Sequence, residues 1–591
     1  MSDMSTWRLS ALPKHPIRPE MLAISAIIGA GLGLRIVKID EQWLWYDDVF
    51  GPVFALQSIF DMMVCVARFD IHPPLWNVQL WLWAQIAHSD TWFMLNSVVW
   101  SVLCIPSLYW ATRSRFGPVT ALIAAGVFAF SPLSVTFAQQ VRMYPMLMFL
   151  LIWAWSFNHR YLAENGSKRS LFAVAGLGIA LTYTHGSGLI LAFYIGVYGL
   201  VAIWRYRPER ERLKGWLIAQ TAVVLLGLPA IANAMVRSVA HLSSPSLESI
   251  FRTLSSLHLG PGYTGVGEGW RITWVATTPV PQIATAVLTI ATVSNLLHKR
   301  SRLVTLALVV VPFSFALALS LTIKPIWYLN TFVPLLPFLA LNLALFLATW
   351  VNKLPQGINQ APAMVLTILA TSLFTFGTGR YINLHRKLTD FESAVYETRE
   401  KLEPGDVLWA PLNFDYWAVA WYFKGHDWGS PLAVQDLEGP RQGKWKQILE
   451  KTNPDTLDMF HLRPKTNYVE VDGIRLYIGH SAREEILASN PPHVYVFQTD
   501  LMEPADWSDE DVTNEVNLDF TKVVEIEGYV EEEKHGYTRL WVKTFVPAEP
   551  GDSGDLGASG LETTTATAAA LAPEPTEASP KAAPTSTTTA E

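Results

Sequence analysis

The chain has 591 residues, of which 50% are hydrophobic and only 16% are charged, and its formal net charge is −7. Soluble domains carry about 25% charged residues, so this composition excludes a purely soluble enzyme, a coiled coil and a disordered scaffold. The negative charge argues against a nucleic-acid partner. The two cysteines, Cys65 and Cys104, are too few for a disulfide framework or a cysteine-rich zinc site.

Long apolar segments recur from residue 20 to residue 379. A helix needs roughly 20 apolar residues to cross a bilayer, with a range of about 17–25. We expect no cleavable signal peptide, because the first 18 residues lack an apolar core. Eleven spans are predicted, at about 20–38, 91–112, 117–136, 143–162, 170–184, 187–204, 216–236, 280–298, 302–322, 330–350 and 361–379.

A further apolar segment, 75–87, is rich in tryptophan but only about 13 residues long, which favours an interfacial position over a span. With this segment interfacial and the N-terminus cytoplasmic, the basic clusters fall in inside loops, as the positive-inside rule expects. An odd number of spans then places the C-terminal region outside. The sole Asn-x-Ser/Thr sequon, at Asn165, falls on an inside loop, which suits a bacterial plasma (inner) membrane.

The hydropathy pattern predicts a polytopic α-helical membrane protein with a small extracytoplasmic α/β domain. Strand-like runs include 406–409, 493–497 and 538–542, and a helix is expected over 392–402, ended by Pro404-Gly405. The predicted parts are a cytoplasmic N-terminus at 1–19, a membrane domain at 20–379 with an outer loop at 39–90, a soluble domain at 380–545, and a disordered tail at 546–591 that is rich in Ala, Thr and Pro.

Two adjacent acids stand in the first outer loop, within Trp45-Tyr46-Asp47-Asp48-Val49-Phe50. Adjacent carboxylates at the mouth of an apolar bundle can bind a divalent cation or accept a proton from an attacking hydroxyl. The alternative is that these are ordinary solvated loop acids.

Later in the same loop the chain reads Asp70-Ile71-His72-Pro73-Pro74-Leu75. The two prolines stiffen the backbone and would fix His72 at the membrane surface. A histidine there can ligate a metal, shuttle a proton or, when protonated, pair with phosphate. The alternative is a turn with an incidental histidine.

Three cationic residues are predicted on outside turns: Arg142 in Arg142-Met143-Tyr144, His185 and Lys324. Arg142 stands alone on its turn, against the positive-inside trend, and a guanidinium suits phosphate. His185 and Lys324 could line the same cavity, or each could be an ordinary interfacial anchor.

The order of these motifs resembles the membrane glycosyltransferases of the C superfamily, specifically the protein O-mannosyltransferase-like group (family 39). The resemblance is strong over about residues 20–200 and looser beyond, and the segment 391–406 also resembles the start of the outer domain in bacterial members. It implies that Asp47 matches the first acid of an Asp-Glu motif and is the base. Here the second acid is Asp48 rather than Glu, which leaves the division of labour between the two acids open.

The resemblance implies an inverting glycosyltransferase that moves a sugar from a polyprenyl-phosphate donor to an acceptor hydroxyl on the outer face. Asp47 and Asp48 would be catalytic, while His72, Arg142, Lys324 and His185 would bind the donor phosphate. Asp48, Asp70 and His72 are candidate ligands of a divalent cation, Mg²⁺ or Mn²⁺, and no organic cofactor is expected.

The sugar and the acceptor stay open, with a lipid, a polysaccharide or a protein as candidate acceptors. The alternatives are a transporter or flippase of a lipid-linked substrate and a non-catalytic anchor. Transport would favour internal repeats and charges near the bilayer midplane, neither of which is clear in the sequence.

Overall fold

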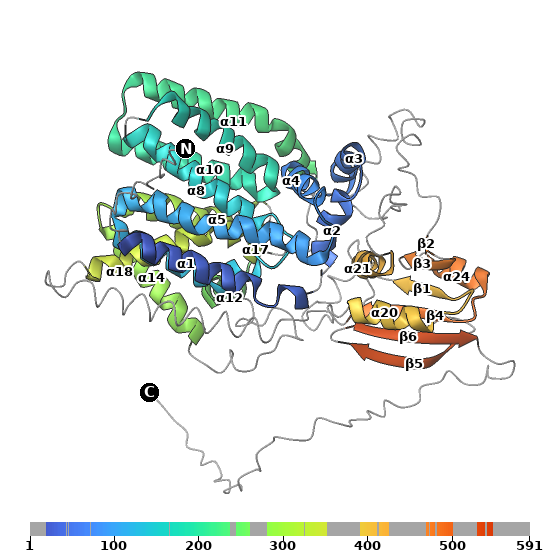
Figure 1. Cartoon of the computed structure of the whole chain (residues 1–591). Helices are drawn as coiled ribbons and strands as arrows, with labels where there is room; N and C mark the ends of the chain where they lie inside the picture. Colours follow the sequence, from blue (N-terminus) through green and yellow to red (C-terminus); the bar gives the residue numbers. More distant parts are fainter. Residues whose placement is uncertain are drawn as a thin grey trace, which may run out of the picture. The chain divides into compact units, whose positions relative to one another are not determined.

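The computed structural model covers most of the predicted membrane domain and the framework of the outer domain (Figure 1). Its described residues up to Val546 belong to one compact unit. The predicted eleventh span (361–379), Lys324, the N-terminal segment up to residue 18 and the tail from residue 548 lie outside the described residues. Those described are 19–42, 44, 46–70, 72–164, 166–236, 244–259, 280–323, 325–351, 391–410, 413–424, 468–471, 473–478, 482–499, 529–537 and 540–547.

Ten of the predicted spans are helical in the described chain. Six helices are long and apolar enough to cross a membrane, so the total of eleven stays a prediction. The helices are α1 (Pro19–Ile36), α5 (Asp90–Phe116), α6 (Pro118–Phe130), α7 (Pro132–Thr136), α8 (Tyr144–Ala163), α9 (Lys168–Thr184), α10 (Gly186–Tyr206), α11 (Arg210–Val236), α14 (Val280–Leu297), α15 (Arg302–Thr305) with η4 (Leu306–Val310) and α16 (Val311–Thr322), and α17 (Leu329–Phe332) with η5 (Val333–Leu335) and α18 (Leu336–Val351).

The predicted span at 117–136 divides into α6 and α7 at Ser131. Pro132 lacks a backbone N–H and cannot continue α6, but it suits the first position of the next helix. The chain then passes through residues 137–143 and returns as α8. This break therefore creates the short turn that carries Arg142.

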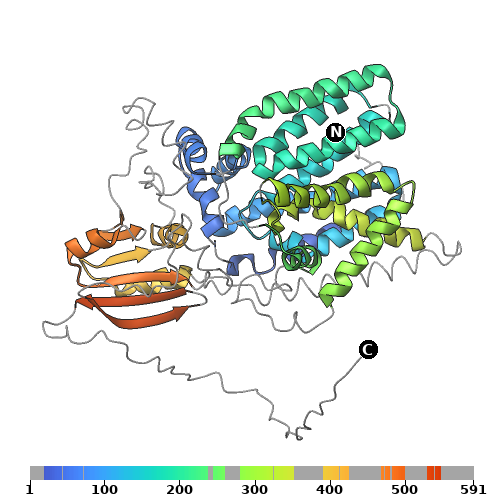
Figure 2. The same cartoon turned by 180° about the vertical axis from the view of Figure 1, so that it is seen from behind.

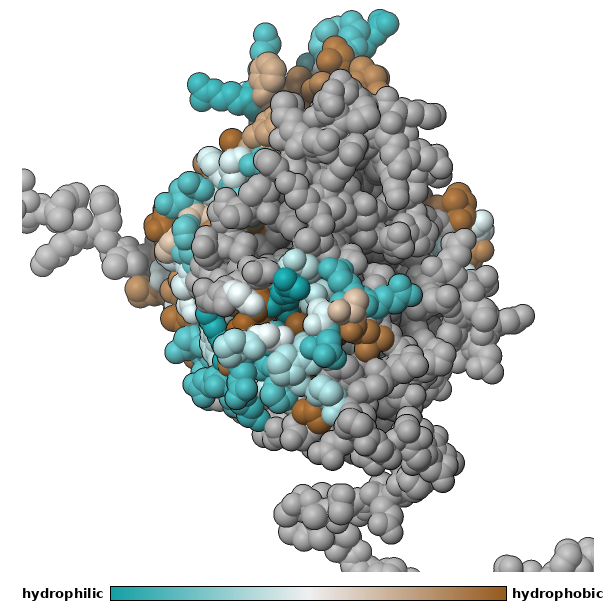
Figure 3. All heavy atoms as spheres, turned by 90° about the vertical axis from the view of Figure 1, so that its right-hand side faces the viewer, coloured by the Kyte–Doolittle hydropathy of each residue, from teal (hydrophilic) through white to brown (hydrophobic). Residues whose placement is uncertain are grey.

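Helices α8, α9, α10 and α11 run side by side in both views (Figures 1 and 2). A hydrogen bond between two buried amides joins α14 to α18, where Asn295 Nδ2 donates to Asn342 Oδ1 at 2.8 Å. Large apolar side chains such as Phe172 (76% exposed) and Ile218 (69%) face outward, as lipid-facing positions do. The described residues facing the viewer in Figure 3 are mostly hydrophilic, and hydrophobic ones gather at the margin of that view.

The first outer loop is largely helical. It contains η1 (Ile39–Glu41), α2 (Tyr46–Ala55), α3 (Ile59–Phe69) and α4 (Leu75–Ala84). At 10 residues, α4 is too short to cross a bilayer, in keeping with its predicted interfacial position. Between α11 and α14 the structure describes one further helix, α12 (Leu247–Leu259).

The outer domain is a mixed sheet with helices. Its helices are α20 (Phe391–Lys401), α21 (Asn413–Lys424) and α24 (Arg483–Ser489), and its strands are β1 (Val407–Ala410), β2 (Tyr468–Val471), β3 (Ile474–Ile478), β4 (Val494–Thr499), β5 (Tyr529–Tyr537) and β6 (Leu540–Pro547). The strand order is β2-β3-β1-β4-β6-β5. β1 pairs in parallel with β3 and β4, whereas β4 pairs antiparallel with β6. The predicted helix at 392–402 and the three predicted strands are confirmed within the described residues.

Close packing of α10 on α11 yields a first testable prediction. A Cβ added at Gly199 would overlap the ring of Trp216, which is buried and donates from Nε1 to Asn158 Oδ1 at 2.9 Å. Gly199→Ala should therefore destabilise the protein by about 1–3 kcal/mol, the usual cost of overpacking. A lower midpoint of thermal unfolding in detergent would show this.

Gly196→Ala, one turn earlier on α10, is the matched control. Its added Cβ would meet only Gln220 Oε1, at 3.5 Å, and alanine favours a helix over glycine by about 1 kcal/mol. We expect this variant to be neutral or slightly stabilising. Equal midpoints for the two variants would contradict the close α10–α11 contact.

Candidate active site

The two adjacent acids lie in the first turn of α2 but face different surroundings. The unpaired backbone N–H groups and the dipole at a helix N-terminus favour carboxylates there. Asp48 is buried, and its Oδ1 accepts the backbone N–H of Val141 at 3.1 Å. Asp47 keeps 38% of its side chain exposed. Asp48 therefore holds the turn before α8 against α2, whereas Asp47 is the acid that a substrate can reach.

Arg142 lies beside Asp47 and is fixed at both its backbone and its side chain. Its Nη1 donates to Asp47 O at 2.8 Å, and its Nη2 is 3.7 Å from Asp47 Oδ2. Its backbone N–H donates to Ser97 Oγ of α5 at 3.3 Å, and Ser97 Oγ is 3.1 Å from Arg142 O. The structure thus brings together a carboxylate and a guanidinium that are far apart in the sequence.

The guanidinium of Arg142 is firmly cationic. Burial alone would lower its pKa, but the charges of Asp47 and Asp48 and the hydroxyl of Tyr144 outweigh burial, so the net shift raises the pKa above its ordinary value. A guanidinium has five N–H donors in a planar fork that suits phosphate oxygens. Arg142 can therefore hold a phosphate at every physiological pH.

His72 and His185 meet beside this pair, with their rings stacked at a centroid distance of 4.0 Å. Asp70 fixes His72, because its Oδ1 accepts the backbone N–H of His72 at 2.8 Å while its Oδ2 accepts Nδ2 of Asn77 at 3.0 Å. Asp70 therefore binds the start of α4 to the turn before it. His72, Arg142 and His185 thus lie close together, and Asp70 holds the backbone of His72.

His185 caps α10 and is neutral. Its Nδ1 accepts the backbone N–H of Ser187 at 2.9 Å, which leaves the proton on Nε2. Burial lowers its pKa well below the ordinary 6.5, and the nearby His72 and Arg142 lower it further. His185 can thus donate a hydrogen bond to an anion, but it adds no positive charge.

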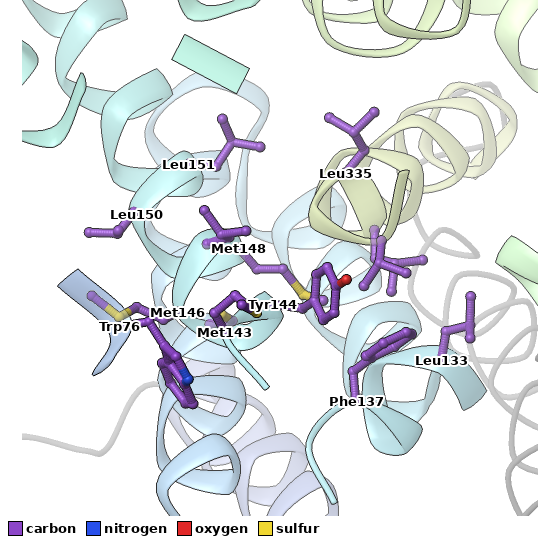
Figure 4. Packing of buried hydrophobic residues seen from close by; sticks show 14 of the residues in the cluster. Trp76, Leu133, Phe137, Met143, Tyr144, Met146, Met148, Leu150, Leu151 and Leu335 are labelled. Carbon is purple, nitrogen blue, oxygen red and sulfur yellow. The ribbon is translucent and has the colours of Figure 1, made fainter. Parts of the chain in front are cut away.

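Two tyrosines were not singled out as site residues in the sequence. The ring of Tyr144 lies 5.9 Å from the guanidinium carbon of Arg142 and 4.8 Å from the ring of Phe137 (Figure 4). Tyr328 directly precedes α17 and keeps 43% of its surface exposed. Lys324, the predicted cation four residues before Tyr328, lies outside the described residues.

The candidate metal ligands do not form a cluster. Among the residues that the structure describes, no group of three or more His, Cys, Asp and Glu side chains could hold a metal ion. Asp48 Oδ1 and both oxygens of Asp70 accept hydrogen bonds from the protein itself. These residues as arranged do not fit a divalent cation, and the involvement of Mg²⁺ or Mn²⁺ stays a prediction.

Comparison with known proteins finds a family match over part of the chain and a shared fold over most of it. The family model for dolichyl-phosphate-mannose-protein mannosyltransferases matches residues 71–232. The structure of ArnT from Cupriavidus metallidurans bound to undecaprenyl phosphate has 12% identity and a TM-score of 0.51, covering 88% of this chain and 97% of that one. The apo form of that protein has 12% identity and a TM-score of 0.52, covering 89% and 98%. Residues 71–232 are therefore similar to this mannosyltransferase family, and over most of its length the chain shares the fold of ArnT. No curated protein matches it.

These similarities support the resemblance drawn from the motifs and confirm the polytopic helical fold with a small C-terminal α/β domain. Six described helices are long and apolar enough to cross a membrane, as expected of a multi-pass membrane protein. The matched segment begins at residue 71, so it contains His72, Arg142 and His185 but not the acid pair. The role of Asp47 therefore depends on its geometry beside Arg142.

The neutral state of His185 predicts an acid-sensitive fold. When the protein unfolds below about pH 6.5, His185 takes up a proton that the folded state excludes, so the free energy of unfolding falls as the pH falls. His185→Asn should remove this contribution, because asparagine can still cap α10. Thermal unfolding in nanodiscs at about pH 7.5 and pH 5 should show a smaller acid-induced loss in the variant. Identical losses would mean that His185 is not held neutral.

Proposed function

We propose that this protein transfers a sugar, a hexose or a pentose, from a polyprenyl-phosphate donor to an acceptor hydroxyl, with inversion at the anomeric carbon. The observation that carries this proposal is the placement of Asp47 Oδ2 3.7 Å from Arg142 Nη2. The reaction needs a base for the acceptor hydroxyl and a cation for the departing phosphate, only a few ångströms apart. The ArnT structure with undecaprenyl phosphate supports a lipid phosphate as the donor class.

In the proposed step, the acceptor oxygen attacks C1 of the sugar while its proton passes to the carboxylate of Asp47. The bond between C1 and the phosphate oxygen breaks, and both of its electrons stay on the phosphate. Arg142 stabilises the charge that develops on this phosphate, and the Nε2–H of His185 and the hydroxyl of Tyr144 are placed to donate hydrogen bonds to it. A single displacement inverts the configuration at C1.

His72 stacks on His185 and helps to enclose the phosphate, and Lys324 is proposed as a further cation. Asp48 holds the Val141 backbone in place, so we assign proton transfer to Asp47 alone. The acceptor hydroxyl belongs to a lipid, a polysaccharide or a protein.

We place this site on the outer face of a plasma membrane. Helix α5 begins at Asp90 and has Arg113 and Arg115 in its last turn, and α8 begins at Tyr144 and has Arg160 in its last turn. The site and these basic residues therefore lie at opposite ends of the same helices. The positive-inside rule assigns the basic end to the cytoplasm, which puts the N-terminus inside and the outer domain outside.

The decisive experiment uses purified protein in lipid nanodiscs with a panel of radiolabelled polyprenyl-phosphate sugars, membrane extract as acceptor, and arms with and without EDTA. Asp47→Asn should lower turnover by about 10²–10⁴-fold, the usual contribution of a general base, while polyprenyl phosphate still binds. Asp40→Asn, an exposed acid in the same outer loop, should keep full activity. If Asp47→Asn retains turnover, Asp47 is not the base.

The same panel identifies the sugar by the donor that is consumed, and its EDTA arm decides the question of a divalent cation. If wild-type protein turns over no donor, the transferase proposal fails. Translocation of the lipid-linked sugar across vesicles would then be measured, because a flippase would move the donor without cleaving it.

Arg142→Lys tests the phosphate-binding role. Lysine keeps the positive charge but loses the planar fork, and a charge-assisted hydrogen bond is worth about 1.5–3 kcal/mol. We expect the Kd for polyprenyl phosphate to rise about 10-fold or more, as measured by titration with the isolated lipid phosphate. Unchanged affinity would remove Arg142 from the donor site.

A further inference from the structure

Two aromatic residues near the end of α21, in the outer domain, contact residues outside that domain. Trp421 and Tyr422 are both buried. Trp421 Nε1 donates to Asp90 Oδ1 at 3.0 Å, and the Tyr422 hydroxyl is 3.2 Å from Asp90 Oδ2. The ring of Trp421 also meets Phe93 at a centroid distance of 6.2 Å in an edge-on arrangement. The first turn of α5 is therefore bound at both carboxylate oxygens of Asp90 and at one aromatic ring.

The Tyr422 hydroxyl makes a second bond, to the outer loop. It accepts the backbone N–H of Leu44 at 2.9 Å, and Leu44 is itself buried. Leu44 stands two residues before the start of α2 and three residues before Asp47. Burial and the charge of Asp90 raise the pKa of Tyr422 well above its ordinary value, so the phenol keeps the proton with which it donates to Asp90. One hydroxyl thus bridges α5 and the segment that leads into α2.

Helix α5 also holds the other half of the candidate site. Ser97, seven residues after Asp90, binds the backbone of Arg142. Seven residues make about two turns of an α-helix, so Asp90 and Ser97 share one face about 10 Å apart. The base and the cation are therefore both placed with reference to α5: Asp47 through Asp90, Tyr422 and Leu44, and Arg142 through Ser97.

We infer that Trp421 and Tyr422 are positioning residues for the transfer reaction, holding the segment before α2 so that the carboxylate of Asp47 faces the substrate beside Arg142. The inference rests on the proposed function, because it takes Asp47 to be the base. Neither residue touches the reacting atoms, and both act through the outer loop. A displacement of a catalytic group by 1 Å can cost about 100-fold in rate, so a hydroxyl that binds the backbone three residues before the base can govern turnover.

Tyr422→Phe is the sharpest variant, because it removes one hydroxyl and keeps the buried ring. We expect kcat to fall about 10-fold, while KM for the donor stays within about twofold because Ser97 still holds Arg142. Tyr396→Phe is the matched control, since its ring on α20 meets that of Tyr422 edge-on at 6.3 Å. This control should leave kcat unchanged. A purely structural role of Tyr422 would lower the amount of folded protein without this split between kcat and KM.

Hydrogen exchange gives a readout that does not depend on activity. In full-length protein in nanodiscs, mass spectrometry of peptides that contain Leu44 should show faster amide exchange in Tyr422→Phe than in wild type, and no change in Tyr396→Phe. If Tyr422→Phe folds poorly, Asp90→Asn serves as the second variant, because its amide still accepts from Trp421 but replaces the carboxylate that binds Tyr422. Like Tyr422→Phe, Asp90→Asn should speed amide exchange at Leu44 and lower kcat.

The outcomes separate the two proposals. Faster exchange together with lower kcat supports the positioning role. If the variant exchanges faster but wild type turns over no donor, the contact between Tyr422 and the loop is supported and the transferase proposal fails. Unchanged exchange at Leu44, or unchanged kcat in an active enzyme, overturns the positioning role.

Discussion

The candidate site depends on one pairing, that of the Asp47 carboxylate with the buried guanidinium of Arg142. The two groups come from segments 95 residues apart in the sequence, and neither segment would hold its position alone. Asp48 joins them by accepting the backbone N–H of Val141, and Ser97 holds Arg142 from α5. A buried guanidinium is costly without such partners, so the surrounding hydrogen bonds fix a reactive geometry and also make it energetically tolerable.

The division of labour within the acid pair follows from burial. Adjacent residues at the start of a helix point in directions about 100° apart, so Asp48 is buried while Asp47 keeps 38% of its side chain exposed. His185 adds a second asymmetry, since its cap on Ser187 leaves Nε2 as a donor. Among the described residues, the phosphate end of the proposed site thus has the cationic Arg142 and the neutral donor His185, a combination that can stabilise a leaving phosphate.

Much of the framework could be predicted from the sequence, because hydropathy over 20 residues is a local property. The ten described spans, the helix at 392–402 and the grouping of His72, Arg142 and His185 all followed from local patterns and motif order. The separate roles of Asp47 and Asp48 could not, because both are acids in one turn and only the distant Val141 distinguishes them. Tyr328 was passed over in favour of Lys324, the charged residue four positions earlier. The contact of Leu44 with Tyr422 spans 378 residues, and no local pattern reports it.

The bridge through the Tyr422 hydroxyl has a thermodynamic consequence. Because one group binds both Leu44 and Asp90, the conformational equilibrium of the outer domain and that of the loop before α2 share a term in free energy. Linkage is reciprocal: a molecule that favours the docked arrangement of α21 also favours the ordered loop, and a donor that orders the loop favours docking to the same extent. A change that separates α21 from Asp90 therefore also weakens the hold on Leu44, so the two contacts form and break as one unit.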